Sequence, residues 1–265
     1  EGWFGFRTTL SRTRITNFSY ECSSQEATAV PLQWIGETPR QDKAVSFGVP
    51  FDKGEVFPEN KLRLSAESGE DIPIDTWTLA YWPDGSVKWG GIAGVIPAGT
   101  EKLTLEKAVK KSKAKSKLPD TDKKKSVSVT ETSQGIHIST GAISAYIPRQ
   151  GEFLIDSLLY KGVKVGGKAR LICHTQSEPV LESTSQVSFT NYIGELKSVT
   201  VERAGSVRAL VKLEGVHKSP NGREWLPFVV RLYFYGGSEQ VKMVHSFVYD
   251  GDQNKDFIRA LGVRF

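Results

Sequence analysis

The stretch that most constrains the fold is residues 72–96, where two runs of aromatic and β-branched residues flank Pro83-Asp84-Gly85. Proline fixes φ near the value that a turn needs, aspartate can accept a hydrogen bond from the backbone ahead of it, and glycine takes the left-handed conformation that closes the loop. The sequence therefore predicts a β-hairpin with a tight tip. Its aromatic side chains form either a core or a platform for sugar rings; they are Trp77, Tyr81, Trp82 and Trp89, with Lys88 beside the last.

Further short strands are predicted on both sides of this hairpin. In the first half of the chain they cover residues 29–35, 44–51, 61–65 and 101–109. Turn residues about every ten positions are typical of a small barrel or sandwich, and no segment has a convincing helical pattern. We therefore expect an all-β protein: a small N-terminal β-barrel followed by an antiparallel β-sandwich.

A lysine-rich segment separates the two halves. Residues 110–125 are almost without apolar side chains, and Pro119-Asp120 interrupts them. We expect a barrel domain at 1–109, a linker at 110–125 and a sandwich domain at 126–265. The lysines indicate a solvated linker or edge strand, or an anchor for an acidic polymer. Nucleic acid is disfavoured as a partner because no aromatic residue alternates with them.

The second half of the chain ends in a predicted antiparallel meander over residues 207–217, 225–235 and 240–250, joined by short turns. Alternation splits the middle strand into two faces. The apolar face, expected in the core, carries Leu226, Phe228, Val230, Leu232 and Phe234. The other, expected to be a half-exposed floor, carries Trp225, Val229, Arg231, Tyr233 and Tyr235. The sequence does not fix the register of the next strand, which carries His245.

Four segments resemble one family. V-S-F-G-V-P-F-D-K-G (45–54) and A-Y-W-P-D-G-S-V-K-W (80–89) resemble the N-terminal RIFT-type β-barrel domain of the exo-rhamnogalacturonan lyase and YetA-like family. W-L-P-F-V-V-R-L-Y-F-Y-G-G-S (225–238) and Y-D-G-D-Q-N-K-D-F-I-R-A-L-G-V-R-F (249–265) resemble its central β-sandwich domain. The match follows the family's order over most of residues 29–265.

The resemblance implies a secreted, periplasmic or cell-surface polysaccharide lyase that cleaves an acidic, uronate-containing polymer, rhamnogalacturonan-like or ulvan-like, by β-elimination. The family continues into a C-terminal α/α-toroid domain, whereas this chain stops at Phe265 after the apolar segment 257–265. We therefore expect a fragment whose toroid is missing. The alternative is a pair of non-catalytic carbohydrate-binding or scaffolding β-domains.

β-Elimination requires a group that neutralises the uronate carboxylate, a base that removes the C5 proton and an acid that protonates the leaving oxygen. The meander offers Arg231 for the carboxylate, His245 as base, and Tyr233 or Tyr249 as acid. The competing interpretation is that the histidine is a hydrogen-bonded core or rim residue and that the tyrosines pack. Sugar-binding candidates are Trp225, Trp82, Trp89 and Lys88.

A metal site is weakly indicated, and we expect no cofactor other than Ca²⁺. Asp250, Asp252, Asn254 and Asp256 place oxygen ligands on alternate residues, as calcium loops do. Lys255 and Leu261 stand where an EF-hand has glycine and glutamate, so a turn in which the aspartates cap backbone N–H groups is favoured.

Two further expectations concern the whole chain. No apolar run is long enough to span a membrane. At the hairpin tip, Asp84 and Lys88 are expected to contact the sandwich or the toroid.

Overall fold

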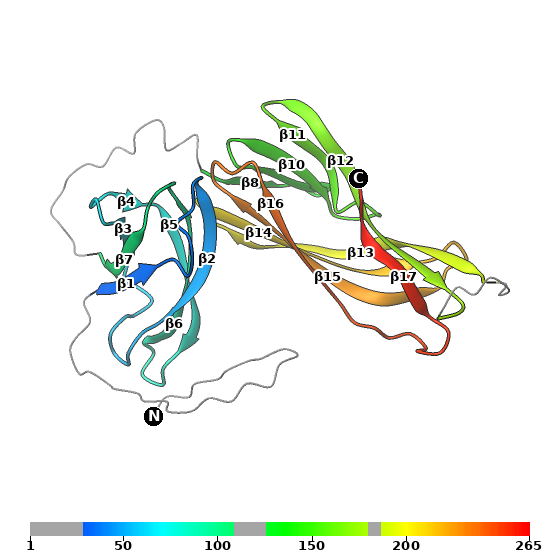
Figure 1. Cartoon of the computed structure of the whole chain (residues 1–265), viewed down its shortest axis with the longest axis horizontal. Coiled ribbons are helices and arrows are strands. Elements are labelled where there is room, and N and C mark those ends of the chain that lie inside the picture. The colour runs from blue at the N-terminus through cyan, green and yellow to red at the C-terminus, as the bar shows by residue number, and fades with distance from the viewer. Residues whose placement is uncertain (1–28, 109–125, 180–186) are drawn as a thin grey trace.

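A computed structural model describes residues 29–108, 126–179 and 187–265, and all regular elements in them are strands (Figure 1). The first domain holds β1 (Ala29–Gln33), β2 (Lys43–Pro50), β3 (Leu62–Ala66), β4 (Asp71–Ile72), β5 (Ile74–Tyr81), β6 (Val87–Ile96) and β7 (Lys102–Lys107). The second holds β8 (Ser128–Glu131), β9 (Gly135–Ser139), β10 (Ile143–Pro148), β11 (Ile155–Tyr160), β12 (Val163–Gln176), β13 (Phe189–Ala204), β14 (Arg208–Lys218), β15 (Glu224–Tyr235), β16 (Val241–Phe247) and β17 (Phe257–Arg264). The predicted all-β class is confirmed. The predicted linker, residues 110–125, lies outside the described residues.

Two small sheets build the first domain. Their strand orders are β1-β7-β3-β4 and β2-β6-β5. Both turn branched side chains toward one shared core, because alternate residues of a strand point to the same face. Fully or nearly fully buried members of this core are Leu64, Ile92, Ile96, Leu105 and Val49.

The predicted hairpin is formed by β5 and β6, and its tip closes as the turn residues require. Gly85 has φ 84°, a conformation that favours glycine. Asp84 accepts hydrogen bonds from the backbone N–H of Ser86 at 3.0 Å and from its hydroxyl at 2.6 Å. These bonds lower the pKa of Asp84, the hydroxyl contributing most. The tip is thus held by its own residues.

Two packed sheets form the second domain (Figure 1). One contains β8 to β11 and the first part of β12; the other runs β17-β12-β13-β14-β15-β16. Strand β12 belongs to both, pairing with β11 over its first half and lying between β13 and β17 over its second half. The predicted core face of β15 is confirmed, since Phe228, Val230, Leu232 and Phe234 are all buried.

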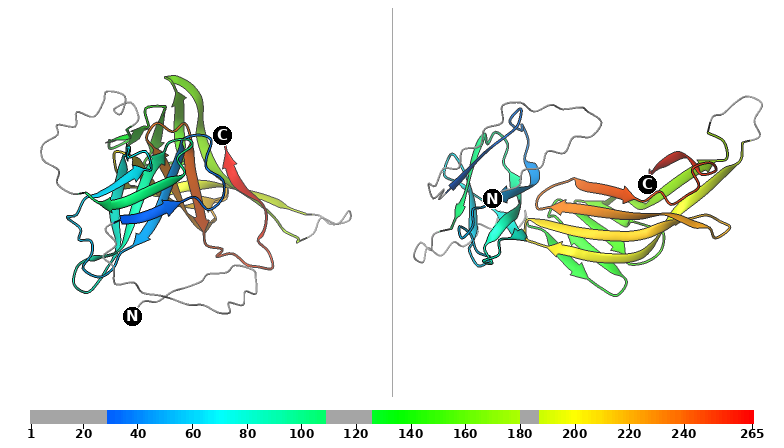
Figure 2. Two further views of the ribbon diagram at one scale, coloured as in Figure 1. Left: turned by 60° about the vertical axis from the view of Figure 1, so that its left-hand side comes forward. Right: turned by 90° about the horizontal axis from the view of Figure 1, so that it is seen from below.

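The longest strands are β12, which covers Val163–Gln176, and β13, which covers Phe189–Ala204. Their far halves project beyond the first sheet (Figure 2). That projection carries its own small core of Cys173, Tyr192, Trp225 and Leu226.

The two domains meet through a polar joint. The carboxylate of Asp75 on β5 accepts hydrogen bonds from the backbone N–H groups of Val207 at 2.9 Å and Arg208 at 2.7 Å. The Arg208 guanidinium lies 4.2 Å from the ring centroid of Trp77, and that of Arg203 lies 4.5 Å from the same ring. Cation–π contacts of this kind favour a fixed orientation between the partners.

The joint is built at the opposite end of β5 from the hairpin tip. Among the described residues, Asp84 and Lys88 therefore take no part in this joint, and their expected contact with the toroid stays a prediction. Asp84 is instead bound to Ser86, and the Lys88 ammonium lies over the Trp82 ring of its own domain, 4.4 Å from the centroid.

We find no helix in the described ranges that is long and apolar enough to cross a membrane.

Candidate functional site

The register between β15 and β16 separates the predicted catalytic residues. Val230 pairs with His245, and Arg231 pairs with Val244. Directly paired residues share a face of the sheet, so His245 lies on the core side of the sheet and Arg231 on the other side. The four candidates therefore do not converge on one point in this structure.

Arg231 and Tyr233 occupy the outer face of β15 with charged neighbours. The Arg231 guanidinium makes a bidentate ion pair with Glu202 on β13, with N···O distances of 2.8 and 3.0 Å. This pair raises the pKa of Arg231 and lowers that of Glu202. The Tyr233 ring lies near Lys242, whose ammonium is 5.4 Å from the ring centroid. Arg231 was expected to bind a substrate carboxylate. In this structure it already binds the carboxylate of Glu202.

His245 faces a second histidine on the inner side. Its ring centroid is 6.4 Å from that of His217, and Phe228 and Phe247 flank it at 6.2 and 5.6 Å. Burial lowers the pKa of both histidines, and His217 lowers that of His245 further. Both Nε2 atoms are buried without a hydrogen-bond partner among the described residues. His245 is therefore held neutral at pH 7 by a water-poor site.

Trp225 is buried, although alternation placed it on the exposed floor. Only 3% of its surface is accessible, so it cannot stack on a sugar ring in this conformation. The cause is an irregularity in the β14–β15 ladder between Gly215 and His217, with Leu226 at φ 51°. An αL residue in a strand breaks the two-residue period, so Trp225 and Leu226 both turn inward.

The strained backbone at Leu226 is held from two directions. Its N–H donates to the Asp250 carboxylate at 2.7 Å, and its carbonyl oxygen lies 2.9 Å from Nδ1 of His217. The Trp225 ring packs between those of Tyr192 and Tyr249, at centroid distances of 5.5 and 5.7 Å. Tyr249, the residue predicted as a possible acid, therefore packs against the ring of Trp225 in this structure.

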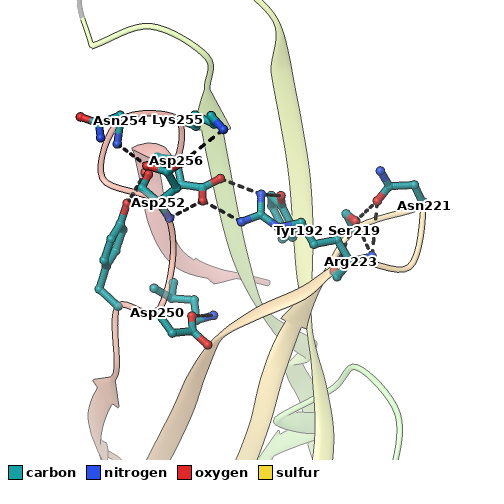
Figure 3. Close-up of polar contacts among 11 residues, drawn as sticks. Tyr192, Ser219, Asn221, Arg223, Asp250, Asp252, Asn254, Lys255 and Asp256 are labelled. Carbon is teal, nitrogen blue, oxygen red and sulfur yellow. Dashed lines mark hydrogen bonds and ion pairs between the residues drawn. The ribbon is translucent and has the colours of Figure 1, made fainter.

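The 249–256 loop uses its polar groups to fix its own shape (Figure 3). The Asp256 carboxylate accepts hydrogen bonds from Nη1 and Nη2 of Arg223, at 2.6 and 2.7 Å, and from the backbone N–H of Asp252 at 2.8 Å. The Tyr249 hydroxyl donates to the carbonyl oxygens of Asp252 and Asp256, at 3.2 and 3.0 Å. Arg223 is the largest cause of the lowered pKa of Asp256.

These contacts favour the capped turn over a calcium loop. Asp250 and Asp256 accept backbone N–H groups within the fold, and the N–H of Asn254 donates to Asp252 at 2.9 Å. No cluster of three or more potential metal-ligating His, Cys, Asp or Glu side chains occurs in the described part of the chain. Asp256 is already neutralised by an arginine, which leaves a cation little to gain there.

The three barrel candidates lie apart from these residues. The Trp82 indole donates to the carbonyl oxygen of Phe51 at 3.0 Å, so its polar edge is used within the domain. Lys88 covers the ring of Trp82. Trp89 is 42% exposed and rests on Gly48, so one face of its ring remains accessible to a ligand.

The projecting part of the second domain carries a groove that was not expected from the sequence. Its volume is about 670 Å³, within the range of about 300–1,000 Å³ typical of small-molecule sites. It lies between the end of β10 and the strands β13 and β14, where Leu196 N–H donates to the carbonyl oxygen of Gly151 at 2.8 Å. Its polar side chains come from Gln150, Glu152, Asn191, Glu195, Lys197 and Lys218. The sequence gives no clear signal for this groove, because residues 189–196 (F-T-N-Y-I-G-E-L) do not alternate between polar and apolar side chains.

A barrel of two small sheets joined to an antiparallel sandwich defines a class of two-domain all-β proteins. Comparison with known families places the chain within it. Residues 28–108 match the PcRGLX-like N-terminal RIFT barrel domain, and residues 127–265 match the PcRGLX-like protein central beta sandwich domain. The chain belongs to the PcRGLX-like and YetA-like family.

A curated relative is the "Uncharacterized protein YetA" of Bacillus subtilis (strain 168), 31% identical over 235 residues. The alignment covers 88% of this chain and 26% of that protein. The chain thus spans about a quarter of the length of this relative.

Proposed function

We propose that this chain is part of a secreted, periplasmic or cell-surface polysaccharide lyase that cleaves a uronate-containing polymer, of rhamnogalacturonan or ulvan type, by β-elimination. The observation that supports this most directly is the match of both domains, in order, to the PcRGLX-like family. The acidic polysaccharide is the partner that the reaction requires, because β-elimination needs a carboxylate next to the carbon that loses its proton.

Among the catalytic candidates, His245 is the one to test first. A neutral imidazole whose Nε2 has no hydrogen-bond partner among the described residues can accept a proton, and burial keeps His245 in that form by lowering its pKa. Because this Nε2 is buried on the core side of the sheet, a uronate could reach it only after a local opening of the sheet. Arg231 would have to leave Glu202 before it could bind a uronate carboxylate. Tyr233 lies on β15 and Tyr249 lies in the loop after β16, so they are alternatives for the acid and not partners.

The lyase proposal is tested by incubating the chain, alone and within its natural full-length protein, with rhamnogalacturonan, ulvan and polygalacturonate. The unsaturated product of β-elimination is followed by its absorbance near ~235 nm. We expect product that is lost in His245→Ala and retained in His137→Ala, a matched control on the exposed face of β9. A full-length protein that forms no unsaturated product from any of the three polymers contradicts the proposal.

The second candidate function is a non-catalytic carbohydrate-binding or scaffolding module. It is favoured by the placement of Arg231 and His245 on opposite faces of the sheet. Under this alternative the chain retards in polysaccharide gels but forms no product, while a longer chain carries the chemistry. A His245→Ala variant of the active full-length protein that keeps its rate supports this alternative.

A further inference from the structure

The groove on the projecting strands is a built feature with fixed walls. Register places Ile193 of β13 beside Lys218 of β14, and Asn191 beside His174 of β12. Asn191 and His174 are hydrogen-bonded through their side chains. On the opposite wall, Glu152 pairs with Arg170 at 2.8 Å, and the contact of Gly151 with Leu196 holds the end of β10 against β13. The walls are thus positioned by the sheet before any ligand binds.

The charges at this groove compensate one another. Lys197 lies 2.8 Å from Glu195 and 3.0 Å from Glu224. Lys218 lies 3.0 Å from Glu195 and 3.8 Å from Glu224. Two ammonium groups therefore face two carboxylates, and their hydrogen bonds lower the pKa of Glu195 and raise that of Lys197. An incoming carboxylate would compete with Glu195 and Glu224 for the same lysines.

A hydroxyl group of a ligand does not have to displace Glu195 or Glu224 from the lysines. It can donate to a carboxylate and accept from an ammonium or amide at the same time, so vicinal hydroxyls can bridge Glu195 with Lys197 or Lys218. The Gln150 amide adds a donor and an acceptor along the rim, and Asn191, whose Oδ1 already contacts His174, adds the donor Nδ2. The apolar floor, to which Ile193, Leu196 and Pro220 contribute, suits the C–H face of a sugar ring.

We propose that this groove binds neutral, hydroxyl-rich sugar residues of a polysaccharide, and that it holds the polymer at a distance from any group that acts on the uronate. The choice of a polysaccharide as ligand rests on the proposed function. The choice of neutral units rests on the paired charges and the apolar floor.

The test is affinity electrophoresis of this chain in gels that contain neutral galactan, rhamnogalacturonan or polygalacturonate. We expect retardation by galactan and rhamnogalacturonan that persists up to about 0.5 M salt, because hydrogen bonds to neutral sugars are not screened as ion pairs are. Gln150→Trp fills the rim and should abolish most of the retardation. Asn191→Ala removes one amide donor and should lower the affinity by roughly two- to tenfold. Gln134→Trp, the same change in an exposed turn outside the groove, should leave it unchanged.

Three results overturn the proposal: galactan that does not retard the chain, retardation that disappears in salt, or groove variants that bind as well as the Gln134→Trp control. Circular dichroism of each variant separates loss of binding from loss of fold. The lyase assay is read separately. If the full-length protein forms product and the groove variants still bind the polymers normally, only the inference about the groove is refuted. If binding resists salt but the full-length protein forms no product, only the proposed lyase activity is refuted.

Discussion

Replacing Asp75 by alanine should uncouple the two domains. Its carboxylate spans the joint, accepting the backbone N–H groups of Val207 and Arg208 at 2.9 and 2.7 Å and the hydroxyl of Ser206 at 3.3 Å. Val207 and Arg208 are both buried, so their N–H groups have little access to water once the carboxylate is removed. Asp75→Ala therefore leaves two buried donors without an acceptor.

The size of the effect follows from those two bonds. A hydrogen bond to a charged group contributes about 1.5–3 kcal/mol, and Asp75 is partly exposed, so the lower part of that range applies to each bond. The docking free energy should fall by about 3–4 kcal/mol, which is more than a hundredfold in the docking equilibrium. Asp75→Asn keeps a neutral acceptor for one or both bonds and should lose about half as much.

Two measurements test this prediction: differential scanning calorimetry reports the unfolding transitions, and small-angle X-ray scattering reports the radius of gyration. The wild-type chain should unfold with the domains coupled and keep a compact radius of gyration, whereas Asp75→Ala should show two separate transitions and a larger radius. Asp71→Ala is the matched control, because Asp71 lies on the same domain and forms only an exposed ion pair with Arg63. Such pairs contribute about 0–1 kcal/mol.

An Asp75→Ala variant that unfolds and scatters like Asp71→Ala would refute the reasoning. In that case the stacking of Arg203 and Arg208 on Trp77 would hold the joint without the carboxylate.

Two further predictions concern the far end of the sandwich. His217 and His245 have pKa values lowered by burial, so their contribution to stability is complete above about pH 6.5 and is lost as the pH falls through the folded pKa values. Urea unfolding at about pH 7.5 and about pH 5.5 should show this loss, and His245→Phe should reduce it; equal pH dependence in both proteins would contradict the burial argument. Arg223→Ala leaves the nearly buried Asp256 carboxylate unpaired and should lower the free energy of unfolding by about 2–4 kcal/mol, since the arginine itself is partly exposed. Added Ca²⁺ should not restore the loss, and a restored thermal midpoint would favour the calcium loop.

Much of the fold was predictable because strand patterns are local. The hairpin at 72–96 is specified by three consecutive turn residues, and the core face of β15 is specified by alternation from Phe228 to Phe234. Each of these signals depends on neighbours within a few positions, where chain stereochemistry acts directly.

The site residues were harder to place because their surroundings depend on pairing between strands. A shift of one residue in the β15–β16 register would have put His245 beside Arg231 on one face. The inward turn of Trp225 requires an αL conformation at a leucine, for which the local sequence gives no signal. Strand β12 is hard to recognise from the sequence because Gly166 and Gly167 follow its first residues, and glycine usually weakens a strand.

The shared strand β12 also sets the order in which the sandwich can be completed during synthesis. Cys173 pairs with Leu261 of β17, so this edge of the sheet closes only after roughly ninety further residues have been made. At about 5–20 residues per second, the half-formed sheet waits on the order of ten seconds with an unpaired strand edge. Among the described strands, those of the N-terminal barrel pair only with one another, so this domain can fold first and present Asp75 and Trp77 as a template to the emerging β14.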